Sequence, residues 1–299
     1  MSENPEILIE AVRKGDTALV SQLLEAGEDP NLTSGVGESL LYLASTLDHV
    51  KVVKTLLGFG GDPNITDMHG YSSLYRASTN RREEVVKLLL EAGADPNFAN
   101  TYRQTPLYWT SSRGHYGVVK LLLDAGSDPN IVDDSGRTPL SRASMTGHAD
   151  VVKLLLDAGA DLNLADEDDG CTPLYRASLN GNAEVAKLLL DAGADANLAD
   201  EDGETPLYRS IWSRQEKFAR VLLEFGADPD IANECGWTPH SIAVIVSHIG
   251  VTGLLREWPR VVSLTMLCQR VIRNKQNKVK VPLWIPPILL RFPSEVEEI

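Results

Sequence analysis

Arginine and tryptophan side chains that could bind a partner recur at a nearly constant spacing along this chain of 299 residues. They follow one another after 33 or 34 positions, and the row consists of Arg76, Trp109, Arg142, Arg176 and Arg209. Trp212 lies about one helical turn beyond the last of them. Guanidinium groups bind carboxylates through paired hydrogen bonds, and tryptophan is frequent at the centres of protein interfaces. The row therefore predicts a surface that binds an acidic or aromatic-containing peptide segment.

The charge of the chain leaves a second interpretation of this row open. Residues 1–258 carry 21 basic and 39 acidic side chains, so a row of arginines is a local exception. The arginines could instead pair with acids in nearby turns of the same chain, such as Asp133, Asp134, Asp168 and Asp202. The sequence supports a partner-binding surface and a set of internal ion pairs about equally.

Residue patterns that carry catalysis or hold a metal are missing from the sequence. It contains no His-Glu-x-x-His, no Cys-x-x-Cys, no phosphate-binding Gly-x-x-x-x-Gly-Lys-[Ser/Thr] and no Gly-x-Ser-x-Gly. The acidic run Glu167-Asp168-Asp169 is typical of a solvated turn, whereas acid–base catalysis needs burial to shift a pKa. We therefore expect no enzyme, no metal site and no cofactor.

Composition narrows the class of protein further. The formal net charge is −14, which repels phosphate backbones and argues against nucleic-acid binding. The three cysteines, Cys171, Cys235 and Cys268, are odd in number and widely spaced, as in proteins of reducing compartments. The chain shows neither a signal peptide at its start nor an apolar run long enough to cross a bilayer. These features predict a soluble intracellular protein, cytoplasmic and compatible with the nucleus, that makes no membrane contact.

The elements that must position the arginine row follow from a repeat of about 33 residues. Thr-Pro-Leu occurs at residues 105, 138, 172 and 205, with degenerate copies at 39, 72 and 238. The threonine suits a helix N-cap and the proline the first helical position. A second apolar phrase, Val85–Asn97 and its copies, predicts a second helix that ends at Gly93 in the left-handed conformation. Each unit is thus predicted to be two short helices and a turn.

This pattern resembles the ankyrin repeat over residues 4–258. We count eight units, with residues 5–32 and 235–258 as capping repeats, and the resemblance implies an all-α, elongated solenoid. It also implies that the first helices and the turns form a concave binding surface, which would include the arginine row and Trp212. Where the family usually has histidine after Thr-Pro-Leu, this chain has tyrosines that we interpret as structural, namely Tyr42, Tyr75, Tyr108, Tyr175 and Tyr208.

The last segment, residues 259–299, differs from the repeats in charge and pattern. It holds seven basic and three acidic side chains. Leu264, Cys268 and Ile272 are spaced by four positions, so they would share one face of a helix. A second phrase, Leu283-Trp-Ile-Pro-Pro-Ile-Leu-Leu-Arg-Phe292, follows.

Together the two phrases resemble a SOCS box, a small helical module in which an elongin-binding helix precedes a cullin box. The resemblance assigns elongin binding to Leu264, Cys268 and Ile272. It assigns cullin binding to Leu283, Ile285, Pro286, Leu289 and Phe292, although Trp284 stands where the family has proline. Ankyrin arrays that end in a SOCS box are substrate receptors of elongin B/C–cullin–RING ubiquitin ligases. The alternative is a plain ankyrin scaffold whose tail helix caps the last repeat.

Overall fold

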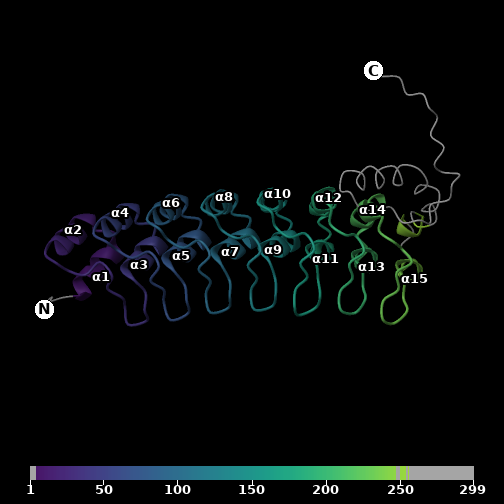
Figure 1. The fold of residues 1–299 in the computed structure, drawn as a ribbon, viewed down its shortest axis with the longest axis horizontal. Coiled ribbons are helices and arrows are strands. Elements are labelled where there is room, and N and C mark those ends of the chain that lie inside the picture. The colour runs from purple at the N-terminus through teal and green to yellow at the C-terminus, as the bar shows by residue number, and fades with distance from the viewer. Residues whose placement is uncertain (1–4, 247–249, 254, 256–299) are drawn as a thin grey trace, which may run out of the picture.

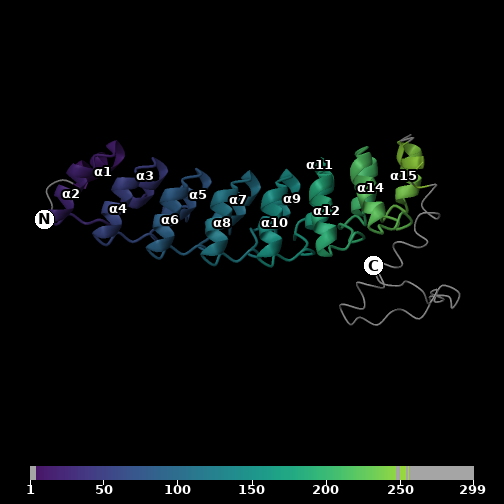
Figure 2. The ribbon, with the colours of Figure 1, turned by 90° about the horizontal axis from the view of Figure 1, so that it is seen from above.

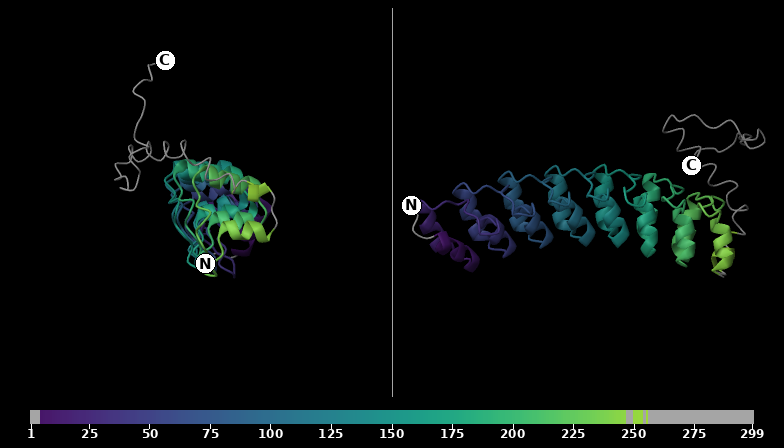
Figure 3. Two further views of the ribbon diagram at one scale, coloured as in Figure 1. Left: turned by 90° about the vertical axis from the view of Figure 1, so that its right-hand side faces the viewer. Right: turned by 90° about the horizontal axis from the view of Figure 1, so that it is seen from below.

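The computed structural model describes residues 5–246, 250–253 and 255. These residues form an elongated row of antiparallel helix pairs, and a turn projects from the same side after each pair (Figure 1). Seen end-on, successive repeats lie behind one another (Figure 3). Within the described ranges, β structure is limited to two isolated bridges, Thr33 to Ser39 and Thr66 to Ser72. The predicted all-α solenoid of helix-turn-helix repeats is confirmed.

The first helices of the repeats form one layer and carry the odd numbers in Figure 1. They are α1 (Pro5–Lys14), α3 (Leu40–Thr46), α5 (Ser73–Thr79), α7 (Pro106–Arg113), α9 (Pro139–Thr146), α11 (Pro173–Asn180), α13 (Pro206–Trp212) and α15 (Pro239–Ile245). From α3 onward each begins at the Ser or Thr that the repeat predicts. In α7, for example, the Thr105 hydroxyl accepts a hydrogen bond from the Tyr108 amide at 3.2 Å, and Pro106 occupies the first turn.

The second helices form the other layer. The first helices lie between this layer and the projecting turns. The second helices are α2 (Thr17–Glu25), α4 (Val50–Gly58), α6 (Glu83–Glu91), α8 (Tyr116–Asp124), α10 (Ala149–Asp157), α12 (Ala183–Ala192) and α14 (Glu216–Glu224). Residues 250–253 and 255 are also helical, in the last repeat. None of the helices in the described ranges combines the length and the apolar character needed to cross a membrane.

The core is a continuous stripe between the two layers. In α8, Val118, Val119 and Leu122 are fully buried, and the equivalent residues of the second helices from α4 to α14 are buried as well. Each first helix packs against the first helix of the next repeat, and each second helix does the same (Figure 2). A repeat therefore completes its core only with its neighbours, as in other solenoids.

Two features recur where the second helices end: a glycine in the left-handed conformation and an asparagine that forms hydrogen bonds to the next repeat. Gly93 takes a φ of 86°, which L residues rarely adopt, and this allows the chain to leave α6. Next, the Asn97 side chain accepts a hydrogen bond from the Asp128 amide at 2.8 Å and donates one to the Gly126 carbonyl at 3.3 Å. Equivalent pairs join Asn31, Asn64 and Asn130 to the repeats that follow them. The recurring asparagine therefore fixes one repeat to the next.

Candidate functional site

The predicted row of side chains lies on consecutive first helices, with Arg76 in α5, Trp109 in α7, Arg142 in α9, Arg176 in α11 and Arg209 in α13. Contacts cross from one repeat to the previous one at equivalent positions. The Arg76 Nε donates to the Tyr42 hydroxyl at 2.5 Å, and the Arg142 Nη2 donates to the Ser112 hydroxyl at 3.4 Å. Stacking of the repeats therefore brings together residues that are 30 or more positions apart.

Aromatic rings surround the arginines in the first half of the row. The Arg76 guanidinium carbon lies 5.3 Å from the centre of the Tyr42 ring and 4.9 Å from that of Tyr71. The Arg142 guanidinium carbon lies 5.6 Å from the Tyr108 ring centre. Such cation–π contacts hold a guanidinium in place without neutralising its charge.

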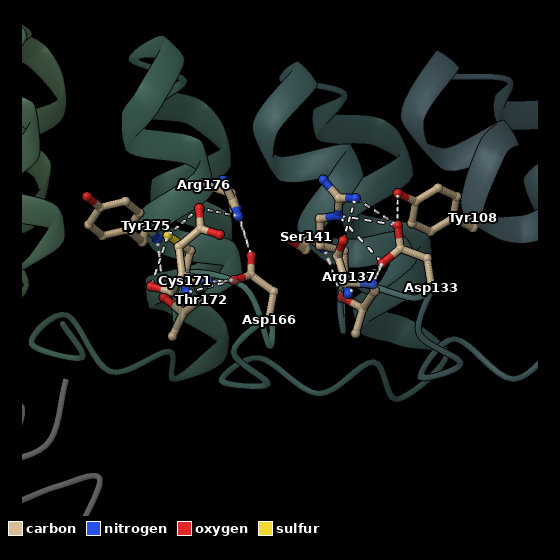
Figure 4. A network of polar contacts seen from close by, with 12 residues as sticks. Tyr108, Asp133, Arg137, Ser141, Asp166, Cys171, Thr172, Tyr175 and Arg176 are labelled. Atoms are coloured by element: carbon tan, nitrogen blue, oxygen red, sulfur yellow. Dashed lines mark hydrogen bonds and ion pairs between the residues drawn. The ribbon is translucent and has the colours of Figure 1, made fainter. Parts of the chain in front are cut away.

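Acids surround the arginines in the second half of the row. The Arg176 Nη2 lies 2.5 Å from the Asp166 Oδ2 and 3.0 Å from the Asp169 Oδ2 (Figure 4). The Arg176 side chain is only 12 % exposed and that of Asp166 is fully buried. Arg209 is closest to Glu204, at 4.0 Å. Internal pairing, which the sequence left open, therefore occurs at Arg176.

The acids in these pairs differ from those that the sequence suggested. Asp133 does not pair with an arginine of the row. Its buried carboxylate instead binds Arg137 of the same turn at 3.2 Å and accepts a hydrogen bond from the Tyr108 hydroxyl at 2.6 Å (Figure 4). Asp134, Asp168 and Asp202 are exposed and form no ion pair within the described part of the chain. The predicted partners were therefore wrong, although internal pairing itself was among the alternatives.

Each turn from the second onward is organised by an Asp or Asn at its first position, where the first turn has Ser34. In the fourth turn, the Asp133 Oδ1 accepts hydrogen bonds from the amides of Ser135 and Arg137, two and four residues later. The extra residue of the fifth turn shifts these bonds, because Asp166 accepts from the amides of Asp169 and Cys171, three and five residues later. The insertion is therefore absorbed within the turn, as expected of an exposed loop. The sequence does carry a signal for this role, because a polar residue recurs about every 33 positions at the start of the turns.

Asp166, Asp169 and Cys171 also place three potential metal ligands within 4.8 Å of one another. Arg176 already binds both carboxylates through its Nη2. Burial raises the pKa of the Cys171 thiol to about 12, which opposes the thiolate form that metals bind. We therefore interpret this cluster as a structural ion pair.

The tyrosines that follow the N-caps are core residues, as interpreted from the sequence. These five tyrosines are between 2 and 5 % exposed, and they are Tyr42, Tyr75, Tyr108, Tyr175 and Tyr208. Burial raises the pKa of all five hydroxyls above the ordinary value of 10. The folded protein therefore holds these protons at a pH where the unfolded chain loses them.

We expect the protein to lose stability steeply above pH 10. Below that pH the tyrosines are protonated in both states, so they contribute no pH dependence. Above it the unfolded state binds fewer protons, and the free energy of unfolding falls by up to about 1.4 kcal/mol per pH unit for each tyrosine. Thermal melts between pH 8 and 11.5 measure this. The Tyr108→Phe variant should show a shallower decline, and a flat melting temperature across pH 10–11.5 would contradict the assignment.

The histidines at the starts of the second helices make structural contacts with the preceding repeat. A ring nitrogen of His49 lies 3.1 Å from the Arg13 carbonyl, and one of His115 lies 3.4 Å from the Ser78 carbonyl. Burial lowers the pKa of His115 and favours the neutral ring. His248 lies outside the described residues.

A groove opens at the N-terminal end of the first-helix layer, between α1, α3 and α5. Its walls carry both charged and apolar side chains, namely Arg13, Glu38, Tyr42, Leu43, Thr46, Leu47, Arg76 and Asn80. Leu47 is 45 % exposed. At the other end of the layer, Trp212 is 51 % exposed. Large apolar side chains are therefore available to a partner at both ends.

The residues predicted to bind elongin and cullin lie outside the described residues. They are Leu264, Cys268, Ile272, Leu283, Ile285, Pro286, Leu289 and Phe292. Their roles remain predictions from the sequence.

Comparison with known proteins identifies the repeat. The family model described as ankyrin repeats (3 copies) matches residues 8–100, 93–166 and 164–233, and these segments together cover most of the chain. No curated protein gives a significant match. The helix pairs, the capped first helices and the projecting turns agree with the family model, and the chain belongs to the ankyrin repeat family.

Proposed function

We propose that this chain is a non-catalytic adaptor that holds a protein partner on the face made by its first helices and turns. Ankyrin repeats support protein–protein interaction. The observation that carries the proposal is the continuous first-helix row, in which Arg76 is held by aromatic rings and Trp212 is half exposed. An elongated face of this kind suits a protein chain better than a small molecule, which prefers an enclosed pocket.

We propose further that residues 259–299 recruit elongin B/C and a cullin–RING scaffold. Support comes from the sequence, because Leu264, Cys268 and Ile272 follow the array directly and the cullin-box phrase from Leu283 comes after them in the expected order. In this function the array holds a substrate and an associated enzyme transfers ubiquitin to it. Tethering raises the local concentration of substrate lysines near that enzyme.

The double variant Leu264→Ala, Cys268→Phe tests the ligase connection. The first change removes the large apolar side chain of the helix face, and the second places a ring where the face must be small. Loss of a desolvated anchor costs about 2 kcal/mol or more, or roughly thirtyfold in affinity. We therefore expect pull-down of purified elongin B/C to be abolished while the melting temperature of the array stays unchanged.

Two controls separate this function from a plain scaffold. A chain that ends at Arg256 should keep the partners of the array, identified by affinity purification and mass spectrometry, and lose elongin. Glu297→Ala, outside both phrases of residues 259–299, should leave elongin capture intact. If the wild-type chain captures no elongin and the double variant melts at a lower temperature, the tail is a cap and the ligase connection is wrong.

A further inference from the structure

The projecting turns change character along the solenoid. The first three turns present exposed apolar side chains, namely Val36, Met68 and Tyr102, which are 54 %, 70 % and 54 % exposed. The last four present exposed acids, in the set Asp134, Glu167, Asp168, Asp169, Glu201, Asp202 and Glu234, and the seventh also exposes Trp237. Consecutive turns are joined by backbone hydrogen bonds, such as Glu167 to Ser135 at 2.9 Å, so the acidic turns form one continuous edge.

Net charge follows the same division. Residues 1–113, through the end of α7, hold ten basic and fifteen acidic side chains. Residues 114–258 hold eleven basic and twenty-four acidic side chains. Most of the negative charge of the array therefore lies in its second half, where it repels an acidic partner.

The arginines at the two ends of the row differ in how much positive charge they can offer, and Arg142 between them contacts the Tyr108 ring and the Ser112 hydroxyl but forms no ion pair with a carboxylate in the described residues. Arg176 is neutralised by two carboxylates, and Arg209 lies beside Glu204. Arg76 contacts only a hydroxyl and two rings, and the Arg113 guanidinium carbon lies 5.5 Å from the Trp109 ring centre. Within the described part of the chain, neither forms an ion pair with a carboxylate.

The N-terminal groove places this charge beside apolar surface. Arg13 and Arg76 line it together with Leu43, Leu47 and the single acid Glu38, whose Oε2 accepts a hydrogen bond from the Ser34 hydroxyl at 3.4 Å. Leu47, Asn80 and Arg113 occupy equivalent positions of successive repeats, since they are 33 residues apart. Arg113 therefore lies on the same face of the first-helix layer as the groove residues Leu47 and Asn80.

We infer that this N-terminal face, made of Arg13, Leu47, Arg76, Arg113 and the first three turns, binds an acidic segment of the partner with apolar side chains between its carboxylates. The inference rests on the proposed function and names the chemistry of the partner. Carboxylates pair with the arginines that have no internal acid, and the apolar side chains contact Leu47, Val36 and Met68. The acidic turns of the second half exclude the same segment, which fixes its place on the solenoid.

Peptide binding to the full-length chain tests this inference. The probe is a fluorescein-labelled peptide (Glu-Asp-Leu)4, measured by fluorescence anisotropy and compared with (Gln-Asn-Leu)4 and (Glu-Asp-Gly)4. Only the first peptide carries both the charge and the apolar groups, so it should bind at least about tenfold more tightly than either of the others. Raising the salt from 50 to 500 mM should weaken its binding, because exposed charge contacts are screened.

Charge-reversed variants locate the site. Arg76→Glu with Arg113→Glu should weaken binding of (Glu-Asp-Leu)4 by at least about tenfold. Lys153→Glu with Lys187→Glu changes the net charge equally, at exposed positions of α10 and α12, and should leave binding within about twofold. Arg209→Glu should also have little effect. Circular dichroism checks that each variant is folded.

Three results would overturn the inference: absence of (Glu-Asp-Leu)4 binding, equal loss in the Lys153 and Lys187 variant, or preferential binding of (Lys-Arg-Leu)4. None of these results bears on elongin capture by residues 259–299. Failure of the charge assignment is therefore distinguishable from failure of the proposed ligase connection.

Discussion

Leu122→Asp is expected to unfold the central repeats. Leu122 is fully buried in α8, between the two helix layers, and its neighbours on both sides are apolar. The change removes a large apolar side chain and buries a carboxylate that has no partner. Together these effects should lower the free energy of unfolding by about 4 kcal/mol or more. Urea denaturation followed by circular dichroism measures the loss.

A matched substitution in the same helix controls for the new charge. Tyr116 is 44 % exposed, so Tyr116→Asp should change the free energy of unfolding by less than about 1 kcal/mol. Deletion of residues 105–137, one whole repeat, should leave a folded but less stable solenoid, because each repeat contacts only its neighbours. Complete loss of helix in that deletion, or a Leu122→Asp variant as stable as wild type, would contradict the modular description.

Asp166→Ala is expected to cost about 3 kcal/mol of stability. The fully buried Asp166 carboxylate binds the largely buried Arg176 guanidinium, and it also accepts hydrogen bonds from the amides of Asp169 and Cys171. Its removal leaves Arg176 with only the half-exposed Asp169 and leaves two turn amides without their acceptor. Breaking a buried pair on one side is costly, because the remaining charge stays away from water. Chemical denaturation measures the change.

Two further variants test the reason for this loss. Asp168→Ala alters an exposed acid of the same turn and should have an effect below about 0.5 kcal/mol. Asp166→Ala combined with Arg176→Met removes both partners, so it should recover part of the stability that Asp166→Ala loses. Equal stability of Asp166→Ala and wild type would show that the pair does not hold the fifth turn in place.

The peptide and denaturation experiments address different halves of one row. Arg176 pairs with acids of the array, whereas Arg76 contacts a hydroxyl and aromatic rings, although both occupy the same position of the repeat. A substitution at Arg176 should therefore be assessed by stability, and a substitution at Arg76 by binding.

The fold was predictable because its information is local and repeated. The Thr105 N-cap, the proline after it and the glycine at position 93 each set the backbone within a few residues, and the structure places all three as expected. Repetition every 33 residues then defines the stacking, since each repeat must cover the apolar stripe of its neighbour. The position of the arginine row on the first helices was predictable for the same reason.

The contacts of individual side chains in that row required the tertiary structure. One extra residue in the fifth turn brings Asp166 and Asp169 to Arg176, whereas Asp133 of the previous turn binds Arg137 and Tyr108. These pairings depend on the path of each turn across the neighbouring helix. The spacing of the sequence fixes which residues share a face, but it does not fix which of several nearby acids comes within hydrogen-bonding distance. The sequence alone therefore determined the repeat, and the packing of turn against helix decided which arginines of the row pair with a carboxylate.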